Sequence, residues 1–195
     1  NSVRLKFLYG SPSLVWQSLI ESWQNNKIYL DLIYTFSATM IGFIIGNIIG
    51  VIVGLALAFS PMLSKISKPF IVALGAIPIF SLAPMMIMWF GTGFIAKVYL
   101  VVFSTFLITT FQAYSGAVSV DIKYKRLFDS LNAKEKHFFL YVRIPNSIVW
   151  VMTSFKITIG FALLGAFIGE FISSDRGLGH LIIKAGSLYN VPMVF

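Results

Sequence analysis

A polar segment, residues 121–146, lies between two long apolar stretches and carries six basic side chains, which can pair with acidic or polar groups of a partner. Apolar residues at Leu127, Leu131 and Phe138 follow helical spacing and predict one amphipathic helix. Asn132 accepts the left-handed backbone conformation and marks a turn. The pattern indicates a helix presented to a soluble partner, or alternatively a helix lying on an anionic membrane surface. The basic residues are Lys123, Lys125, Arg126, Lys134, Lys136 and Arg143.

Two more ionisable residues, Lys156 and Glu170, lie in the apolar stretch that follows. Burying an unpaired charge in a membrane costs several kcal/mol, so both are functional candidates. Lys156 can snorkel toward the nearer membrane surface. Glu170 is a candidate for a gate or a polar interface. We expect a turn and a helix cap near Asp175 and His180.

No catalytic or metal-binding pattern accompanies these residues. The chain has two His, no HExxH spacing, no Cys and no phosphate-binding GxxxxGK[ST] loop. We therefore expect no catalytic residue, metal or cofactor in this chain.

Composition predicts an integral membrane protein. Hydrophobic residues make up 57% of the chain, charged residues 11%, and the mean hydropathy is +0.85, whereas soluble domains are about one quarter charged. The net charge of +8 fits cytoplasmic loops near anionic lipid, and we expect no nucleic-acid partner.

A helix needs about 20 apolar residues to cross the bilayer core. We expect one all-α transmembrane domain over residues 1–195, with five to six helices. The chain begins without Met and stops in an apolar run, so we expect the protein to continue beyond one or both ends. The predicted spans are residues 32–59, 70–90, 98–118 and 148–171, with another starting near residue 191.

Lys and Arg counts predict the orientation. They place the segment 121–146 and a loop at residues 60–69 in the cytoplasm. The turn at residues 91–96 and the segment 173–190 then face outward.

The first two spans contain residues with special backbone properties. Glycines at every fourth position of the first span allow close helix packing, or alternatively a sliding interface. The second span has two prolines that kink or unwind it, which is tolerated where a helix lines a cavity. The glycines are Gly42, Gly46, Gly50 and Gly54, and the predicted pathway residues are Pro78, Phe80, Ser81, Pro84, Met85 and Met88.

The order of these features resembles the permease subunits of ABC importers, of the nitrate, sulfonate and taurine type, over residues 34–195. The features are the glycine-rich span, a proline-containing span ending in Trp-Phe-Gly, the helical loop, a span ending in Gly-Glu and a Gly-Leu-Gly turn. The family's loop signature is Glu-Ala-Ala, three residues, Gly, nine residues, Ile-x-Leu-Pro. Its end is kept here as Val142, Ile144 and Pro145. Its start departs, because Arg126 replaces Glu, and Asn132, followed by Ala133, replaces Gly.

The resemblance implies that a loop helix near residues Asp129–Phe138 docks on a cytoplasmic ATP-binding subunit, which holds ATP and Mg²⁺. It also implies a second permease copy, identical or not, and an external solute-binding protein. The implied solute is a small anion, a sulfonate or a vitamin precursor. For an anion, Ser81, Thr105 and Thr109 are reasonable pathway lining.

Two other readings stay open. A secondary transporter or channel needs a series of embedded charges or an inverted repeat, and a membrane enzyme needs paired carboxylates or a His cluster within a span.

Overall fold

The computed structural model describes residues 11–24, 27–173 and 175–194. All regular elements within these ranges are helical, as the sequence predicts. In chain order they are α2 (Pro12–Gln24), α3 (Lys27–Phe59), α4 (Pro61–Ala76), η1 (Ile79–Leu82), α5 (Ala83–Phe90), α6 (Phe94–Val118), α7 (Ile122–Ser130), α8 (Glu135–Phe138), the π-helical turn η2 (Phe139–Arg143), α9 (Ile144–Ile172), α10 (Leu178–Ser187) and α11 (Val191–Val194).

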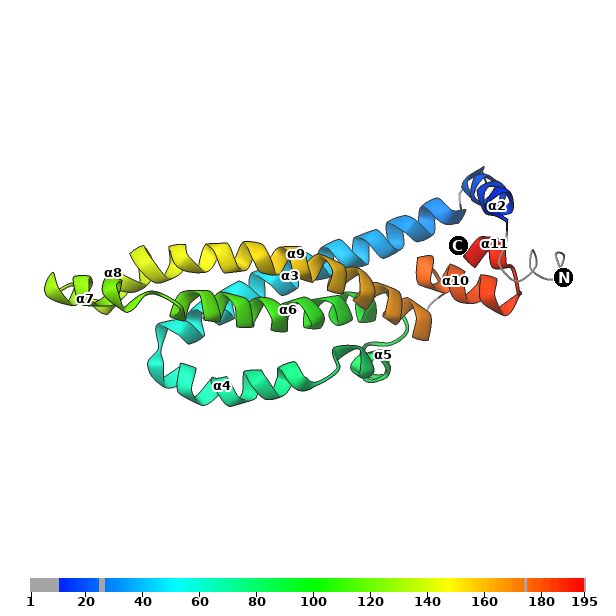
Figure 1. Cartoon of the computed structure of the whole chain (residues 1–195). Helices are drawn as coiled ribbons and strands as arrows, with labels where there is room; N and C mark the ends of the chain where they lie inside the picture. Colours follow the sequence, from blue (N-terminus) through cyan, green and yellow to red (C-terminus); the bar gives the residue numbers. More distant parts are fainter. Residues whose placement is uncertain (1–10, 25–26, 174, 195) are drawn as a thin grey trace.

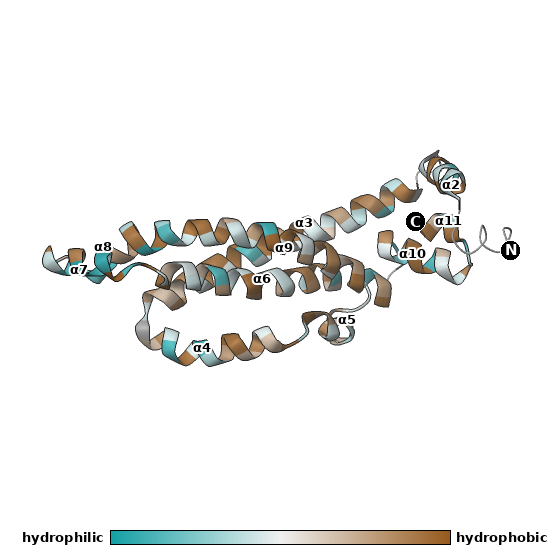
Figure 2. Cartoon of the chain, in the orientation of Figure 1, coloured by the Kyte–Doolittle hydropathy of each residue, from teal (hydrophilic) through white to brown (hydrophobic). Residues whose placement is uncertain are grey.

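Three long helices, α3, α6 and α9, form the body of the fold (Figure 1). In the described part of the chain, three segments are long and apolar enough to cross a membrane, namely residues 28–59, 94–118 and 135–172. Apolar residues dominate these helices, and hydrophilic residues gather around α7 and α8 (Figure 2). The exposed sides of the bundle are therefore largely hydrocarbon, which suits contact with lipid.

The second predicted span is broken. Helices α4 and α5 bend by 80° around the break and together form at most one further span. The residue before a proline is pushed out of the helical region, and Ile77, which precedes Pro78, has φ −73° and ψ 126°. Pro84 lies in the first turn of α5, where its missing N–H leaves no helical bond unmade.

The segment predicted as a loop at residues 60–69 is helical from Pro61 onward, and its cytoplasmic location stays a prediction. Ser60 caps a helix there by accepting a 3.3 Å hydrogen bond from the backbone N–H of Leu63. Helix α4 then runs through Pro69 to Ala76. The polar residues after the cap and the apolar residues that follow them therefore belong to one helix.

The four spaced glycines of α3 lie against α6. A Cβ atom on Gly42 would be 2.5 Å from the Cβ of Val101, and one on Gly50 would be 2.9 Å from the Cβ of Thr109. These distances are shorter than any ordinary contact, so α3 and α6 approach closely only because side chains are absent. Gly46 and Gly54 meet α6 in the same way. The predicted close packing is thus confirmed within this chain.

A polar node holds the centre of the bundle. Asn47 on α3 accepts hydrogen bonds from the hydroxyls of Thr109 on α6, at 2.5 Å, and Thr158 on α9, at 3.2 Å. All three side chains are buried. Since an unpaired polar group is costly in a membrane interior, this node fixes how the three helices sit relative to one another.

Candidate functional site

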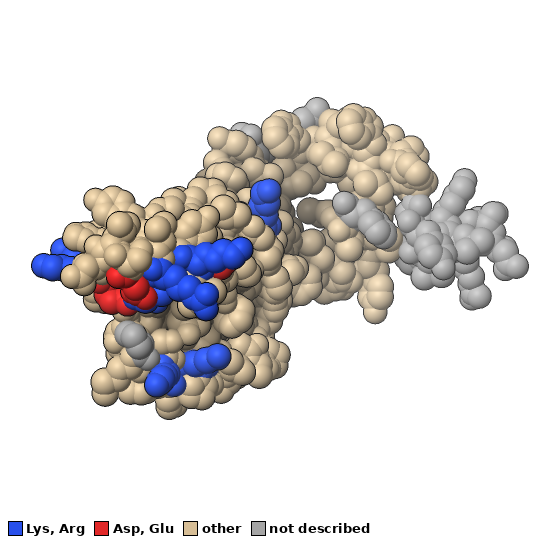
Figure 3. Space-filling view, turned by 60° about the vertical axis from the view of Figure 1, so that its left-hand side comes forward, with Lys and Arg blue, Asp and Glu red and all other residues tan. Residues whose placement is uncertain are grey.

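The basic end of the molecule carries α7 and α8 (Figure 1). Figure 3 shows that Lys and Arg side chains gather there. Basic residues accumulate on the cytoplasmic side of membrane proteins. The charge asymmetry therefore supports a cytoplasmic position for residues 121–143, which we call the basic loop.

The basic loop contains two helices, so the prediction of one amphipathic helix with a single apolar stripe is wrong, although the turn predicted at Asn132 is present. Helix α7 ends at Ser130, and α8 begins at Glu135 after a turn. Asn132 has φ 53° in that turn, the left-handed conformation predicted for it. Asn takes this conformation more readily than most residues, so the turn forms without glycine.

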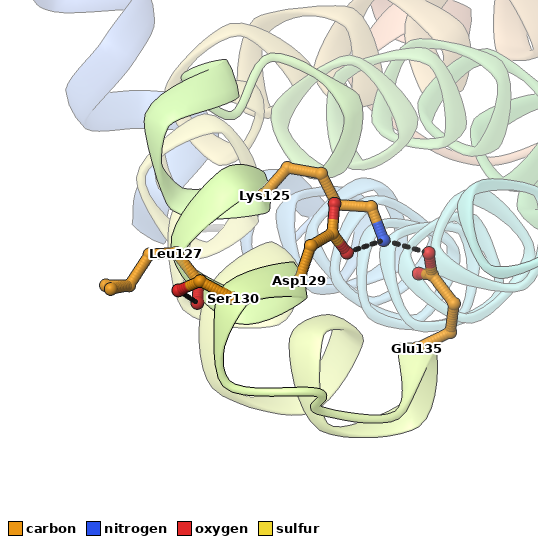
Figure 4. A network of polar contacts seen from close by, with 5 residues as sticks. All are labelled: Lys125, Leu127, Asp129, Ser130 and Glu135. Carbon is orange, nitrogen blue, oxygen red and sulfur yellow. Dashed lines mark hydrogen bonds and ion pairs between the residues drawn. The ribbon is translucent and has the colours of Figure 1, made fainter.

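An ion-pair network closes this turn (Figure 4). The ammonium of Lys125 lies 3.2 Å from the carboxylate of Asp129 within α7, and it also donates to the carboxylate of Glu135 on α8. The Glu135 hydrogen bond, followed by that of Asp129, raises the pKa of Lys125. Lys125 therefore stays charged at any physiological pH and holds the two helices together.

Phe138 forms the interior of the loop. It is 3% exposed, and its ring meets the ring of Phe128 edge to face, with centroids 5.4 Å apart. The cations of Lys125 and Arg143 each lie 5.3 Å from the centroid of the Phe138 ring. The predicted place of Phe138 on one outward apolar stripe with Leu131 is therefore wrong, because the turn separates α7 from α8.

Other apolar side chains of α7 and of its C-cap residue point outward. Tyr124, Leu127 and Leu131 are each more than half exposed, with Leu131 at 69%. Of the remaining predicted loop residues, Arg126 and Asp129 are exposed and Ala133, Val142 and Ile144 are partly buried. Pro145 lies in the first turn of α9, as predicted.

Two contacts join the basic loop to α3. Arg143 donates a 2.9 Å hydrogen bond to the carbonyl of Ala58, in the last turn of α3. The rings of Phe59 and Phe139 pack edge to face with centroids 5.0 Å apart. Since η2 also runs directly into α9, the basic loop is connected to both spans.

A second polar cluster lies at the opposite end of the bundle. Glu170 is 1% exposed. One of its carboxylate oxygens accepts from the Thr35 hydroxyl at 2.8 Å, and the other accepts from the N–H of Gly179 at 2.8 Å. The N–H of Gly177 donates to Asp31 at 2.7 Å. Glu170 therefore belongs to a polar interface between α3, α9 and α10, and a role in gating stays a prediction.

These contacts satisfy the first N–H groups of α10 and place carboxylates at its positive end. Gly177 has φ 108°, and a Cβ there would overlap the Glu170 carboxylate. A Cβ on Gly179 would lie 2.8 Å from the Cβ of Glu170. Glycine is therefore required on both sides of Leu178. The buried ammonium of Lys97 completes the cluster by donating to the carbonyls of Thr92 and Ser173.

The predicted pathway residues lie in and around the break between α4 and α5. Pro78, Ser81, Pro84, Met85 and Met88 are exposed, with Met88 at 84%. The ring of Phe80 stacks on Phe161 of α9, with centroids 6.2 Å apart.

For two of the three polar residues predicted to line an anion pathway, the prediction is wrong. Thr105 and Thr109 are fully buried between α6 and its neighbours. Ser81 is exposed. Among the described residues, no three His, Cys, Asp or Glu side chains lie together where a metal ion could bind.

Residues 46–195 match the family described as binding-protein-dependent transport system inner membrane component. The match covers most of the chain, including all the spans after the first. The chain belongs to this family. It is the transmembrane permease subunit of an ATP-driven importer, located in the inner membrane.

Relatives named for a transported compound align with most of this permease. The riboflavin permease RibX of Chloroflexus aurantiacus is 32% identical over 97% of this chain and 70% of its own length. The formylaminopyrimidine permease ThiX of Halalkalibacterium halodurans is 27% identical over 97% of this chain and 75% of its own. The taurine permease TauC of Escherichia coli is 27% identical over 72% of this chain and 51% of its own.

A solved structure shares the fold. The methionine ABC transporter MetNI, in an inward-facing conformation, aligns with a TM-score of 0.68 and 17% identity, covering 94% of this permease and 87% of that chain. At this identity the likeness concerns the fold alone. It supports the predicted membrane helix bundle.

Proposed function

We propose that the basic loop of this permease docks on a separate cytoplasmic ATPase subunit through the exposed side of α7. The observation that carries this proposal is the exposure of Tyr124, Leu127 and Leu131 at the most basic end of the molecule. Exposed apolar side chains within a charged, water-facing surface are typical of a protein interface. Phe138 supports this surface from inside and does not take part in it.

In this proposal, the ATPase subunit binds ATP, and docking on the basic loop couples it to the permease. ATP binding draws two ATPase subunits together, and each carries one basic loop with it. The Arg143–Ala58 hydrogen bond passes the movement to α3, and η2 passes it to α9. Two permease copies then change which side of the membrane their shared pathway opens to.

Purification of the full-length permease with its partners in mild detergent tests the docking surface. We expect a stoichiometric ATPase subunit to copurify with the wild type, and we expect Leu131→Asp to lose most of it. Ile122→Asp is the matched control, because Ile122 is 59% exposed but lies on the opposite side of α7. Retention of the ATPase by Leu131→Asp would show that these apolar side chains do not carry docking. A solitary wild-type chain would favour a secondary transporter or channel.

We further propose that an external binding protein delivers a small solute, of the anion, sulfonate or vitamin-precursor type. Relatives named for riboflavin, formylaminopyrimidine and taurine support a small polar solute. Uptake of these three compounds by cells that express the complete transporter tests the class. ATP-dependent uptake of one of them supports the proposal, and uptake of none in an otherwise ATP-hydrolysing complex contradicts it.

A further inference from the structure

Lys156 lies at mid-depth in the bundle. At about 1.5 Å per residue, it is roughly 15 Å beyond Asn146 along α9, half the thickness of a bilayer core of about 30 Å. Thr158, two residues further along α9, is 3.2 Å from Asn47, which sits in the middle of α3. At this depth the side chain is too short to bring its charge to either membrane surface, so the snorkelling predicted from the sequence is not expected here.

Lys156 also points away from the rest of the chain. Ser154 and Thr158 are fully buried against the neighbouring helices, and Lys156, two residues from each, lies on the opposite side of α9. Its side chain is exposed. Within the described part of the chain it has neither a hydrogen-bond nor an ion-pair partner. Thr153 and Gly160, one turn away on either side, are exposed as well.

The exposed side of α3 at the same depth is different. Ile41, Ile45, Ile48 and Ile52 are exposed there, at 41–62%, and form an entirely apolar surface that fits lipid. A charged side chain in the middle of the bilayer almost always faces a water-filled cavity or a polar partner. The side of α9 that carries Lys156 differs from this surface of α3 by its charge, while Met152 and Ile159 beside Lys156 are apolar and exposed.

We propose that the side of α9 formed by Thr153, Lys156 and Gly160 lines the aqueous translocation pathway, where Lys156 attracts the acidic group of a passing solute. The group is a carboxylate, sulfonate or phosphate, the anions that an ammonium binds best. This inference rests on the proposed importer function and deepens it, because it assigns the solute a negative charge.

Cysteine labelling tests the position of Lys156, because the chain contains no Cys. Lys156→Cys is introduced into the full-length permease in complex with its ATPase. A charged, membrane-impermeant methanethiosulfonate is then added with and without ATP trapping, and the mass shift of the permease chain is followed. We expect labelling at least tenfold faster than that of Ile48→Cys, its lipid-facing control at the same depth. Equally slow labelling of both cysteines in both states would overturn the proposal, since Lys156 would then face lipid or another protein segment.

A second experiment tests the charge. Thr153→Cys is labelled with an anionic and with a cationic methanethiosulfonate, in the presence of Lys156, Lys156→Arg or Lys156→Met. A single cation in a narrow pathway concentrates anions about tenfold or more, so we expect the anionic-to-cationic rate ratio to fall about tenfold with Met and to persist with Arg. A ratio that is the same with Lys and Met would overturn the assignment of an anion-attracting role.

Different results would contradict the importer function and the pathway assignment of Lys156. If no ATPase copurifies with the wild-type chain, the importer mechanism fails whatever the labelling shows. If the ATPase copurifies and is lost from Leu131→Asp, but Lys156→Cys is not labelled, only the pathway assignment fails.

Discussion

The guanidinium of Arg143 donates a hydrogen bond of 2.9 Å to the backbone carbonyl of Ala58. Ala58 lies in the last turn of α3, where carbonyls lack partners within the helix. The same guanidinium lies over the ring of Phe138. One side chain therefore joins the interior of the basic loop to the end of a membrane span. The loop and α3 must move together for as long as this contact holds.

Replacing Arg143 should separate ATP hydrolysis from transport. Loss of a hydrogen bond from a charged donor costs about 1.5–3 kcal/mol, which shifts an equilibrium between attached and detached loop by about tenfold or more. We expect Arg143→Met to keep the ATPase bound, since the outer side of α7 is untouched, but to take up much less solute per ATP hydrolysed. Lys offers a single donor and no planar stack, so Arg143→Lys should rescue only partly. Normal coupling in Arg143→Met would mean that the loop moves α9 alone.

Phe138→Asp should unfold the basic loop rather than weaken its outer surface. Removing a large buried aromatic side chain costs about 3–5 kcal/mol, more than the new carboxylate could regain from the nearby cations of Lys125 and Arg143. Limited proteolysis of the purified permease measures this, with cleavage between α7 and α8 expected to become rapid. Phe138→Leu, which keeps an apolar side chain, should remain largely resistant. Protease resistance in Phe138→Asp together with loss of the ATPase would instead place Phe138 at the docking surface.

Glu170→Gln should loosen the start of α10. The neutral amide is a weaker acceptor for the N–H of Gly179 than the carboxylate, and it interacts less favourably with the positive end of the helix. We expect hydrogen exchange at Gly179 and its neighbours to speed up while the middle of α9 is unchanged. A loss of about 1–3 kcal/mol is expected for this buried, charge-assisted contact.

Thr35→Val is the companion variant for this cluster. It removes the hydroxyl that donates to Glu170 and accepts from the N–H of Leu178. It should produce the same local exchange pattern. Unchanged protection of α10 in both variants would show that packing alone holds this helix.

Local patterns in the sequence predicted the features that depend on a residue's own backbone. The glycines of α3 recur every four residues, and Asn132 is one of the few residues other than Gly that adopt positive φ readily. Pro78 pushes the residue before it out of the helical region, and Pro84 fits the first turn of a helix. Each of these properties is local, so each could be recognised without knowing the fold.

Features that depend on pairing across the bundle could not be predicted in this way. Asn47 is 62 residues from Thr109 and 111 residues from Thr158. Nothing in the sequence of α3 indicates that Asn47 pairs with these two residues. Because this pairing could not be seen in the sequence, Thr109 was expected in the pathway, although its hydroxyl donates to Asn47. The single helix predicted over the basic loop fails similarly, because apolar spacing continues across a turn that the chain makes at residues 131–134.

Gly50→Leu should separate α3 from α6. A Cβ on Gly50 would lie 2.9 Å from the Cβ of Thr109 and 3.0 Å from the carbonyl oxygen of Phe106, and a leucine adds three more carbon atoms at this contact. The helices must move apart, which also stretches the hydrogen bond between Asn47 and Thr109, close to Gly50. We expect a poorly folded permease. In size-exclusion chromatography in detergent it should elute early, and the ATPase should no longer elute with it.

Gly75→Leu in α4 is the matched control, because a Cβ on Gly75 has no atom within 4 Å. It should assemble like the wild type. Gly50→Ala distinguishes close approach from helix propensity: alanine favours a helix by about 1 kcal/mol over glycine, yet its Cβ already overlaps α6. If Gly50→Ala stabilises the permease, α3 and α6 have room to adjust, and the spaced glycines must serve movement between helices rather than tight packing.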